Sequence, residues 1–77
     1  MASDLEPAAL VTGGSRGIGA AIVKRLAARG LPVVNIDRTP PEEAVADYVE
    51  VDLTDVDATR DALHEITARQ PILWLVN

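Results

Sequence analysis

A glycine-rich segment near the amino terminus constrains the fold of this chain more than any other feature. Residues 12–19 read Thr-Gly-Gly-Ser-Arg-Gly-Ile-Gly, directly after the apolar residues 8–11 and directly before a helical pattern. A strand, a glycine turn and a helix in this order are the context that a phosphate-binding turn requires. The segment therefore predicts a β-strand that passes into an α-helix through a turn able to bind a pyrophosphate group.

The glycines of this turn have distinct expected roles. Gly13 can adopt the backbone angles of a sharp turn, and Gly17 lets the main chain approach a pyrophosphate without an intervening side chain. Gly19 lets the helix lie close to the sheet. The amides around Ile18 and Gly19, in the first turn of the helix, are expected to face an anion at the positive end of the helix dipole.

Apolar strand patterns and helical spacings alternate along the rest of the chain. The strands are expected at residues 8–11, 33–36, 48–51 and 72–76, the last of them buried. The helices are expected at residues 17–29 and 54–69, with one or two helical turns at residues 42–46. Gly30 offers a left-handed cap at the end of the first helix. This alternation predicts an α/β fold, a Rossmann-type doubly wound parallel sheet with strand order 3-2-1-4 that binds ligands outside the carboxyl ends of its strands.

The second long helix has an expected start and an expected buried face. Thr54 and Asp57 have the spacing of a capping box, in which side chains satisfy the first free amides of a helix. Pro71 ends the segment, because proline cannot continue a helix. The buried stripe of this helix is expected to comprise Val56, Thr59, Leu63 and Ile66.

The glycine spacing is T-G-x-x-x-G-x-G rather than the common G-x-G-x-x-G. Asp37 ends the second strand, Asp52 and Leu53 follow the third, and the chain ends in Leu-Val-Asn at residues 75–77. Together these features resemble the short-chain dehydrogenase/reductase family. The resemblance implies an NAD(P)-dependent oxidoreductase that transfers a hydride between the nicotinamide and a secondary alcohol or ketone. A non-catalytic dinucleotide-binding sensor or regulator on the same fold is the alternative.

The resemblance covers nearly the whole chain but only part of the family pattern. Family members continue through a second half with a catalytic Ser, a Tyr-x-x-x-Lys pair and the substrate loop. We therefore expect residues 1–77 to be the amino-terminal half of a single NAD(P)-binding Rossmann domain, truncated after the fourth strand. No catalytic residue is assigned within this chain.

Asp37 governs the expected choice of cofactor. It lies about twenty residues beyond the glycine turn, where a carboxylate can accept hydrogen bonds from both hydroxyls of the adenosine ribose and would repel a 2′-phosphate. Its alternative role is that of a turn residue before Arg38. Arg16 and Arg38 stand where family members that use NADP contact the additional phosphate. We expect NAD, because a carboxylate facing a phosphate is unfavourable, and keep NADP as the alternative.

The resemblance also implies roles for the segments after the third and fourth strands. Asp52 would accept from the exocyclic amine of adenine, and the amide of Leu53 would donate to the ring; alternatively, Asp52 caps the following helix. Thr12 would brace the glycine turn, and Asn77 would flank the cofactor and brace the central sheet. The expected cofactor-binding residues are Gly13, Ser15, Arg16, Gly17, Ile18, Gly19, Asp37, Arg38, Asp52, Leu53 and Asn77.

Composition excludes several other classes of function. The net charge of −5 and the dispersed basic residues argue against nucleic acid or an anionic membrane as partner. Without cysteine, neither a disulfide nor a thiol metal site can be proposed, and no metal site is assigned.

His64 is expected to be an ordinary surface residue, and Trp74 to pack within its strand. The acidic start does not resemble a secretory signal peptide, so a cytoplasmic location is expected.

The short length leads to an expectation about partners. A complete dinucleotide-binding domain needs more than about 100 residues, so four strands and two crossover helices would leave apolar surface bare. We expect the carboxy-terminal remainder of the same protein, as a second chain, to cover the fourth strand. A small-molecule substrate and a homo-oligomer, dimer or tetramer, are expected of the complete protein.

Overall fold

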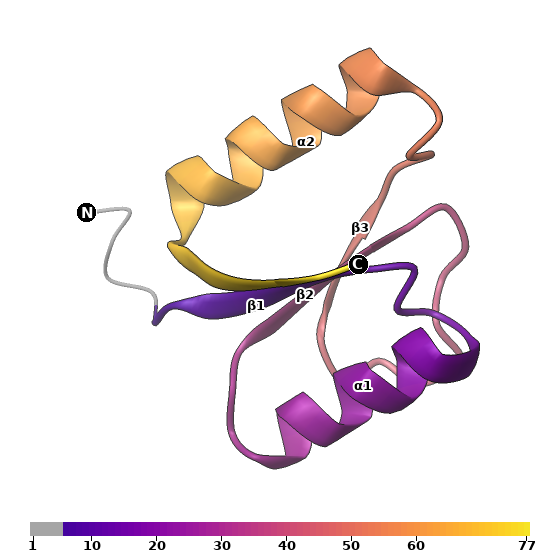
Figure 1. Ribbon diagram of the computed structural model, residues 1–77, viewed down its shortest axis with the longest axis vertical. Helices are drawn as coiled ribbons and strands as arrows, with labels where there is room; N and C mark the ends of the chain where they lie inside the picture. Colours follow the sequence, from indigo (N-terminus) through magenta and orange to yellow (C-terminus); the bar gives the residue numbers. More distant parts are fainter. Residues whose placement is uncertain (1–5) are drawn as a thin grey trace.

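The computed structural model describes residues 6–77 and places one helix on each face of a four-stranded parallel sheet (Figure 1). The strands lie in the order β3-β2-β1-β4, which confirms the predicted order. Because all four strands run in the same direction, their carboxyl ends meet at one edge of the sheet. The elements are β1 (Ala8–Thr12), α1 (Gly17–Ala28), β2 (Val33–Asp37), β3 (Asp47–Glu50), α2 (Val56–Arg69) and β4 (Ile72–Val76).

The two central strands are buried on both faces, as central strands of a parallel sheet are. Alternate residues of a strand point to opposite faces. On one face Leu10 and Ile36 pack with Ile66 of α2. On the other face Val11 and Val33 pack with Val23 of α1, and Val33 shares its face of β2 with Asn35. Aliphatic side chains from β1 and β2 therefore form two thin cores.

Helix α1 begins and ends where the glycines predict. It starts after Arg16, whose backbone is extended, and no side chain caps its first amides. Its carboxyl end is closed by Gly30, which has a φ of +83° and donates its amide to the carbonyl of Ala27 at 3.0 Å. The predicted left-handed cap at Gly30 is therefore confirmed.

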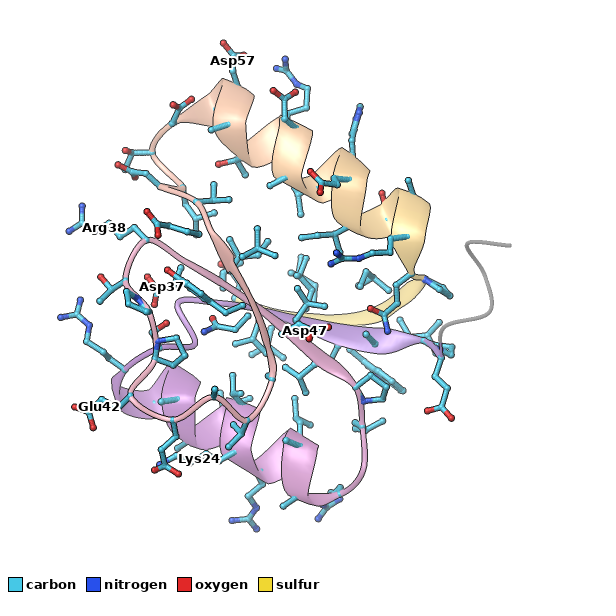
Figure 2. All side chains as sticks on the ribbon, turned by 180° about the vertical axis from the view of Figure 1, so that it is seen from behind. Lys24, Asp37, Arg38, Glu42, Asp47 and Asp57 are labelled. Carbon is cyan, nitrogen blue, oxygen red and sulfur yellow. The ribbon has the colours of Figure 1, made fainter. Side chains whose placement is uncertain are left out.

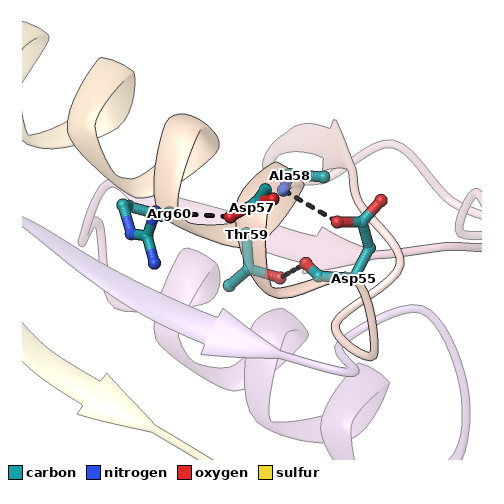
Figure 3. Close-up of polar contacts among 5 residues, drawn as sticks. All are labelled: Asp55, Asp57, Ala58, Thr59 and Arg60. Carbon is teal, nitrogen blue, oxygen red and sulfur yellow. Dashed lines mark hydrogen bonds and ion pairs between the residues drawn. The ribbon is translucent and has the colours of Figure 1, made fainter.

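The amino-terminal cap of α2 is Asp55, and the predicted capping box of Thr54 and Asp57 is wrong. The side chain of Asp55 accepts a hydrogen bond from the amide of Ala58 at 3.0 Å (Figure 3). Thr54 is already engaged, because its amide and hydroxyl both donate to the Oδ1 atom of Asp52, at 3.0 and 2.7 Å. The helix cap therefore lies one residue later than the spacing alone indicated.

The buried face of α2 is confirmed at its carboxyl end and wrong at its start. Ile66 is buried and Leu63 packs against the same core. Val56, the first residue of the helix, is 67% exposed. Figure 1 shows why, because α2 lies farther from the sheet at its start than at its end. Thr59 is half-buried, as Leu63 is, and its hydroxyl donates to the carbonyl of Asp55 at 2.8 Å (Figure 3).

The connection between β2 and β3 contains no helix, contrary to the turns predicted at residues 42–46. Only nine residues, 38–46, separate the two strands, which leaves little chain for a helix after the two prolines. The loop is instead held against α1 by an ion pair between Lys24 and Glu43, with 2.7 Å between Nζ and Oε1. Lys24 and Glu42 lie side by side on this flank in Figure 2.

Strand β4 is an outer strand in residues 6–77 and is not buried as predicted. It pairs with β1 alone, and Leu73, Trp74 and Leu75 are 60%, 50% and 65% exposed. The physical reason is that these side chains have strand neighbours on one side only. Trp74 is consequently half exposed instead of packed within the sheet. No helix among the described residues has the length and apolar character needed to cross a membrane.

Candidate functional site

The residues predicted to bind a cofactor all lie at or just beyond the carboxyl ends of the strands. This is the edge at which open parallel sheets bind ligands. The glycine turn follows β1, Asp37 ends β2, and Arg38 directly follows it. Asp52 and Leu53 follow β3, and Asn77 follows β4. The fold therefore places segments that are far apart in sequence along one edge, which makes this edge the candidate site.

The glycine turn uses its three predicted glycines in two different ways. Gly13 and Gly17 have φ angles of +67° and +58°, in the left-handed region that a Cβ atom disfavours. No atom of residues 6–77 would obstruct a Cβ at either position, so glycine is required there by the backbone conformation and the surrounding space is open. A Cβ at Gly19 would instead collide with the carbonyl oxygen of Gly13. Gly19 therefore permits the start of α1 to lie directly against the turn.

The amides at the start of α1 are free to bind an anion. The first helical hydrogen bond runs from the amide of Ala20 to the carbonyl of Arg16, at 3.2 Å. Among residues 6–77, the amides of Gly17, Ile18 and Gly19 have no hydrogen-bond acceptor, and no acidic residue lies in the first helical turn. Three free amides at the positive end of a helix dipole, next to open space at Gly17, fit a pyrophosphate group.

Asn35 lies in β2 beneath the glycine turn and is hydrogen-bonded to two of its residues. This role was not predicted from the sequence. The Oδ1 atom of Asn35 accepts the amide hydrogen of Gly14 at 2.9 Å, and its Nδ2 atom donates to the Ser15 hydroxyl at 3.0 Å. Asn35 is 1% exposed and Ser15 4% exposed. The signal in the sequence was a single amide side chain within an otherwise apolar strand.

Asp37 contacts the turn as well as the edge of the site. Its Oδ2 atom accepts from the amide of Ser15 at 3.2 Å, and its Oδ1 atom from the amide of Arg38 at 2.7 Å. Burial alone would raise the pKa of Asp37, but hydrogen bonds from Ser15, Arg38 and Thr39 outweigh it and lower the pKa below its usual value. The carboxylate is therefore ionised at neutral pH and fixed in position.

The backbone around Asp37 is tied to β3. The carbonyl of Asp37 accepts from the hydroxyl of Tyr48 at 3.1 Å and from the amide of Val51 at 3.0 Å. Arg38, next along the chain, is exposed and points away from the sheet (Figure 2). Asp37 is thus part of a rigid strand end, whereas the guanidinium of Arg38 stands in solvent.

Asp52 does not cap α2, so that alternative is wrong. Its Oδ1 atom accepts from both the amide and the hydroxyl of Thr54, and these bonds lower the pKa of Asp52. The helix cap is Asp55. Asp52 therefore forms a local turn just before the helix, and it is exposed, as is the side chain of Leu53 at 43%.

Thr12 and Asn77 join the ends of two neighbouring strands. The hydroxyl of Thr12 donates to the Oδ1 atom of Asn77 at 2.9 Å. Thr12 is the last residue of β1, and Asn77 directly follows β4. The contact joins the ends of β1 and β4, whereas the roles expected of Thr12 toward the glycine turn and of Asn77 toward the cofactor stay predictions.

A cleft of about 190 Å³ opens between the glycine turn and the loop that follows β2. The charged residues that line it are Arg16, Lys24, Glu42 and Glu43. Two basic and two acidic side chains leave the cleft without net charge, and Lys24 is already paired with Glu43. His64 is exposed on α2, and in residues 6–77 no three His, Cys, Asp or Glu side chains gather as metal ligands.

Comparison with known proteins identifies relatives of this chain. The sequence model described as short chain dehydrogenase matches residues 7–77. The short-chain reductase protein NovJ of Streptomyces niveus is 59% identical over 34 residues, which are 44% of this chain and 13% of that protein. The uncharacterized oxidoreductase pbr1 of Schizosaccharomyces pombe is 48% identical over 40 residues, 52% of this chain and 11% of that protein.

Solved structures give the same result for the fold. Aldohexose dehydrogenase (AldT) of Thermoplasma acidophilum in its ligand-free form matches with a TM-score of 0.72 and 35% identity, over 84% of this chain and 26% of that chain. A C-terminal deletion mutant of AldT matches with a TM-score of 0.70 and 34% identity, over 83% and 28% of the two chains. The chain thus spans only a small fraction of the length of the relatives that it matches.

Proposed function

We propose, from the premise that this chain belongs to the short chain dehydrogenase family, that it supplies the adenosine and pyrophosphate site of an NAD-dependent oxidoreductase. Members of the family are mostly NAD(P)-dependent oxidoreductases. When bound, the cofactor would supply hydride transfer to or from a secondary alcohol or ketone. The residues of this chain would bind and orient it.

The free amides at the start of α1 carry this proposal. Among residues 6–77 no acceptor bonds to the amides of Gly17, Ile18 and Gly19, and the space beside Gly17 is open. A pyrophosphate at this position would receive hydrogen bonds and would lie at the positive end of the helix dipole. Asp37 stands at the end of the neighbouring strand, where its carboxylate could accept from a ribose.

Two features favour NAD over NADP. The carboxylate of Asp37 is held ionised by its hydrogen bonds, and a negative charge there disfavours a phosphate on the ribose. The cleft beside the turn adds no net positive charge, because Glu42 and Glu43 balance Arg16 and Lys24. Arg38 is the remaining candidate for a phosphate contact, and it points into solvent (Figure 2).

We further propose that more of the same protein, or a second chain, covers β4. Leu73, Trp74 and Leu75 expose apolar surface on an outer parallel strand, and such strands are normally covered. Amide hydrogen exchange tests this proposal. Amides of residues 72–76 should exchange rapidly in the isolated chain and much more slowly in the complete protein. Equal rates in both would contradict it.

The proposed function is tested by cofactor binding and by turnover. Titration calorimetry of the complete protein with NAD and NADP should give saturable binding with NAD preferred. Oxidation of a panel of secondary alcohols should change the absorbance of the nicotinamide. If neither NAD nor NADP binds, the proposal is refuted. Binding without turnover of any alcohol in the panel would favour a sensor or regulator.

A further inference from the structure

Asn35 occupies an unusual position in the sheet. It lies in β2, one of the two central strands, and is 1% exposed with aliphatic neighbours on both sides in sequence. Burying an amide side chain without hydrogen-bond partners costs stability. Asn35 avoids that cost because both ends of its carboxamide are bonded to the glycine turn. Its burial and its two bonds suit one task, which is to hold that turn.

The two bonds fix the turn at successive residues. The Oδ1 atom of Asn35 accepts a hydrogen bond from the amide of Gly14. This amide therefore points into the protein rather than toward the site. The Nδ2 atom donates to Ser15, whose own amide then donates to the carboxylate of Asp37. The Ser15 hydroxyl also contributes to lowering the pKa of Asp37. A continuous set of contacts therefore links Asn35, the turn and Asp37.

Gly14 shows how closely Asn35 approaches the turn. A Cβ at Gly14 would lie 2.5 Å from the Oδ1 atom of Asn35 and 2.7 Å from the Cγ2 atom of Val23. The glycine is therefore required by close packing and not by a left-handed backbone, in contrast to Gly13 and Gly17. The turn rests directly on Asn35 and Val23.

We propose that Asn35 is a positioning residue of the dinucleotide site, which sets the backbone of the phosphate-binding turn and the place of the Asp37 carboxylate through Gly14 and Ser15. The inference rests on the proposed dinucleotide-binding function. Asn35 itself need not touch the ligand. Its contribution is to present the free amides of α1 and the carboxylate in a fixed arrangement before the ligand binds.

The test compares two replacements of Asn35 with a control on the same strand. Asn35→Leu removes both hydrogen bonds at similar volume. Asn35→Asp keeps an acceptor for Gly14, and it can donate to Ser15 only while the introduced carboxyl is protonated. Ile36→Val is the control, because it faces the α2 core and costs a modest amount of stability without touching the turn.

NAD affinity is measured by titration calorimetry on the complete protein between about pH 5 and about pH 9, a range in which a buried carboxyl can titrate. Asn35→Leu should weaken NAD binding about tenfold or more at every pH, the effect of one or two hydrogen bonds. Asn35→Asp should bind nearly as wild type at the acid end and lose affinity as pH rises. Wild type and Ile36→Val should show neither loss.

The pH dependence depends on the charges around the introduced carboxyl. Asp37 on β2, with Glu42 and Glu43 in the loop, would raise its pKa, as burial would; Arg16 and Lys24 would lower it. Lys24 is paired with Glu43, so the raising influences should prevail. Because the ionised buried carboxyl also destabilises the fold as pH rises, thermal unfolding of Asn35→Asp is followed at each pH, and a loss of affinity where this variant is still fully folded is a result that general destabilisation would not produce.

The outcomes separate failure of the inference from failure of the proposed function. If wild type binds NAD and Asn35→Leu binds it equally well, or if Asn35→Asp follows wild type at every pH, the inference is overturned. If wild type binds neither NAD nor NADP, the proposed function fails. The positioning role of Asn35 is then tested by amide hydrogen exchange at Gly14, which should be faster in Asn35→Leu than in Ile36→Val. Equal exchange rates in the two variants would overturn the inference.

Discussion

Replacement of Asp37 by alanine is the sharpest perturbation of cofactor choice. The carboxylate has two expected partners in NAD, the hydroxyls of the adenosine ribose, and observed partners in the protein that include the amides of Ser15 and Arg38. Asp37→Ala removes all of these contacts. Loss of the bond to Ser15 should affect NAD and NADP alike, because it acts through the shared phosphate-binding turn. Only the ribose contacts distinguish the two cofactors.

The magnitude follows from charge-assisted hydrogen bonds. Each is worth about 1.5 to 3 kcal/mol when well formed, and about 1.4 kcal/mol corresponds to a tenfold change in Kd. Two bonds would give about two to four powers of ten. Water that replaces the carboxylate recovers part of this, so NAD binding should weaken by roughly 10-fold to 1,000-fold. NADP should weaken less or bind better, because the repelling charge is gone.

Titration calorimetry with both cofactors, on wild type and variant, measures the effect. Asp37→Asn is an informative companion, because it keeps an oxygen that can accept from Ser15 and removes the charge. Asp47→Asn is the matched control: it makes the same change of charge at the start of β3, at the opposite edge of the sheet. If wild type already prefers NADP, or if Asp37→Ala leaves the ratio of the two Kd values unchanged, Asp37 is a turn residue and the assignment of NAD is wrong.

Three further predictions concern stability and are read from thermal or urea unfolding of the complete protein. Gly14→Ala should destabilise by about 1 to 3 kcal/mol, as overpacked sites do, because its Cβ would meet Asn35; an unchanged midpoint would contradict the close packing. Asp55→Ala should cost about 0.5 to 2 kcal/mol, as loss of a helix cap does, and more than Asp57→Ala, which removes an exposed ion pair and one negative charge from the first helical turn (Figure 3). Hydrogen bonds lower the pKa of folded Asp37, so its stabilisation should be complete above the unfolded value of about 3.9 and lost as pH falls through the folded pKa. Asp37→Asn should therefore show a weaker loss of stability below about pH 4 than wild type, and equal acid profiles would exclude this contribution.

Local patterns in the sequence were enough to predict the elements of the fold and their order. Hydrophobic runs and helical spacings report on which residues are buried within one element, and the glycine turn implies the strand and helix on either side of it. The four strands, the two long helices and the left-handed cap at Gly30 were predicted for this reason. Matches at widely separated positions, from the glycine turn to Asp37 and Asp52, pointed to the family that the comparisons then showed.

The predictions that were wrong concern residues whose environment is set by contacts with other segments of the chain. Thr54 is a residue type that often caps helices, but its hydroxyl donates to Asp52, and Asp55 caps α2 instead. Val56 has the spacing of the buried stripe but lies where α2 stands away from the sheet. The loop after β2 contains helix-forming residues, yet its short span and the ion pair of Lys24 with Glu43 hold it without a helix.

The sequence by itself determined the succession of strands and helices along the chain, the phosphate-binding turn and the acidic residue at the end of β2, because each depends on residue types at short spacing. The order of the strands in the sheet followed from the doubly wound fold class that this succession indicates. Only the tertiary structure decided that Asn35 lies under the turn and that Asp37 is bonded to Ser15. These contacts join residues about twenty positions apart, and their geometry depends on how β1 and β2 pair and how closely α1 packs on them. Hydrogen bonds require a match of distance and direction that no local pattern specifies.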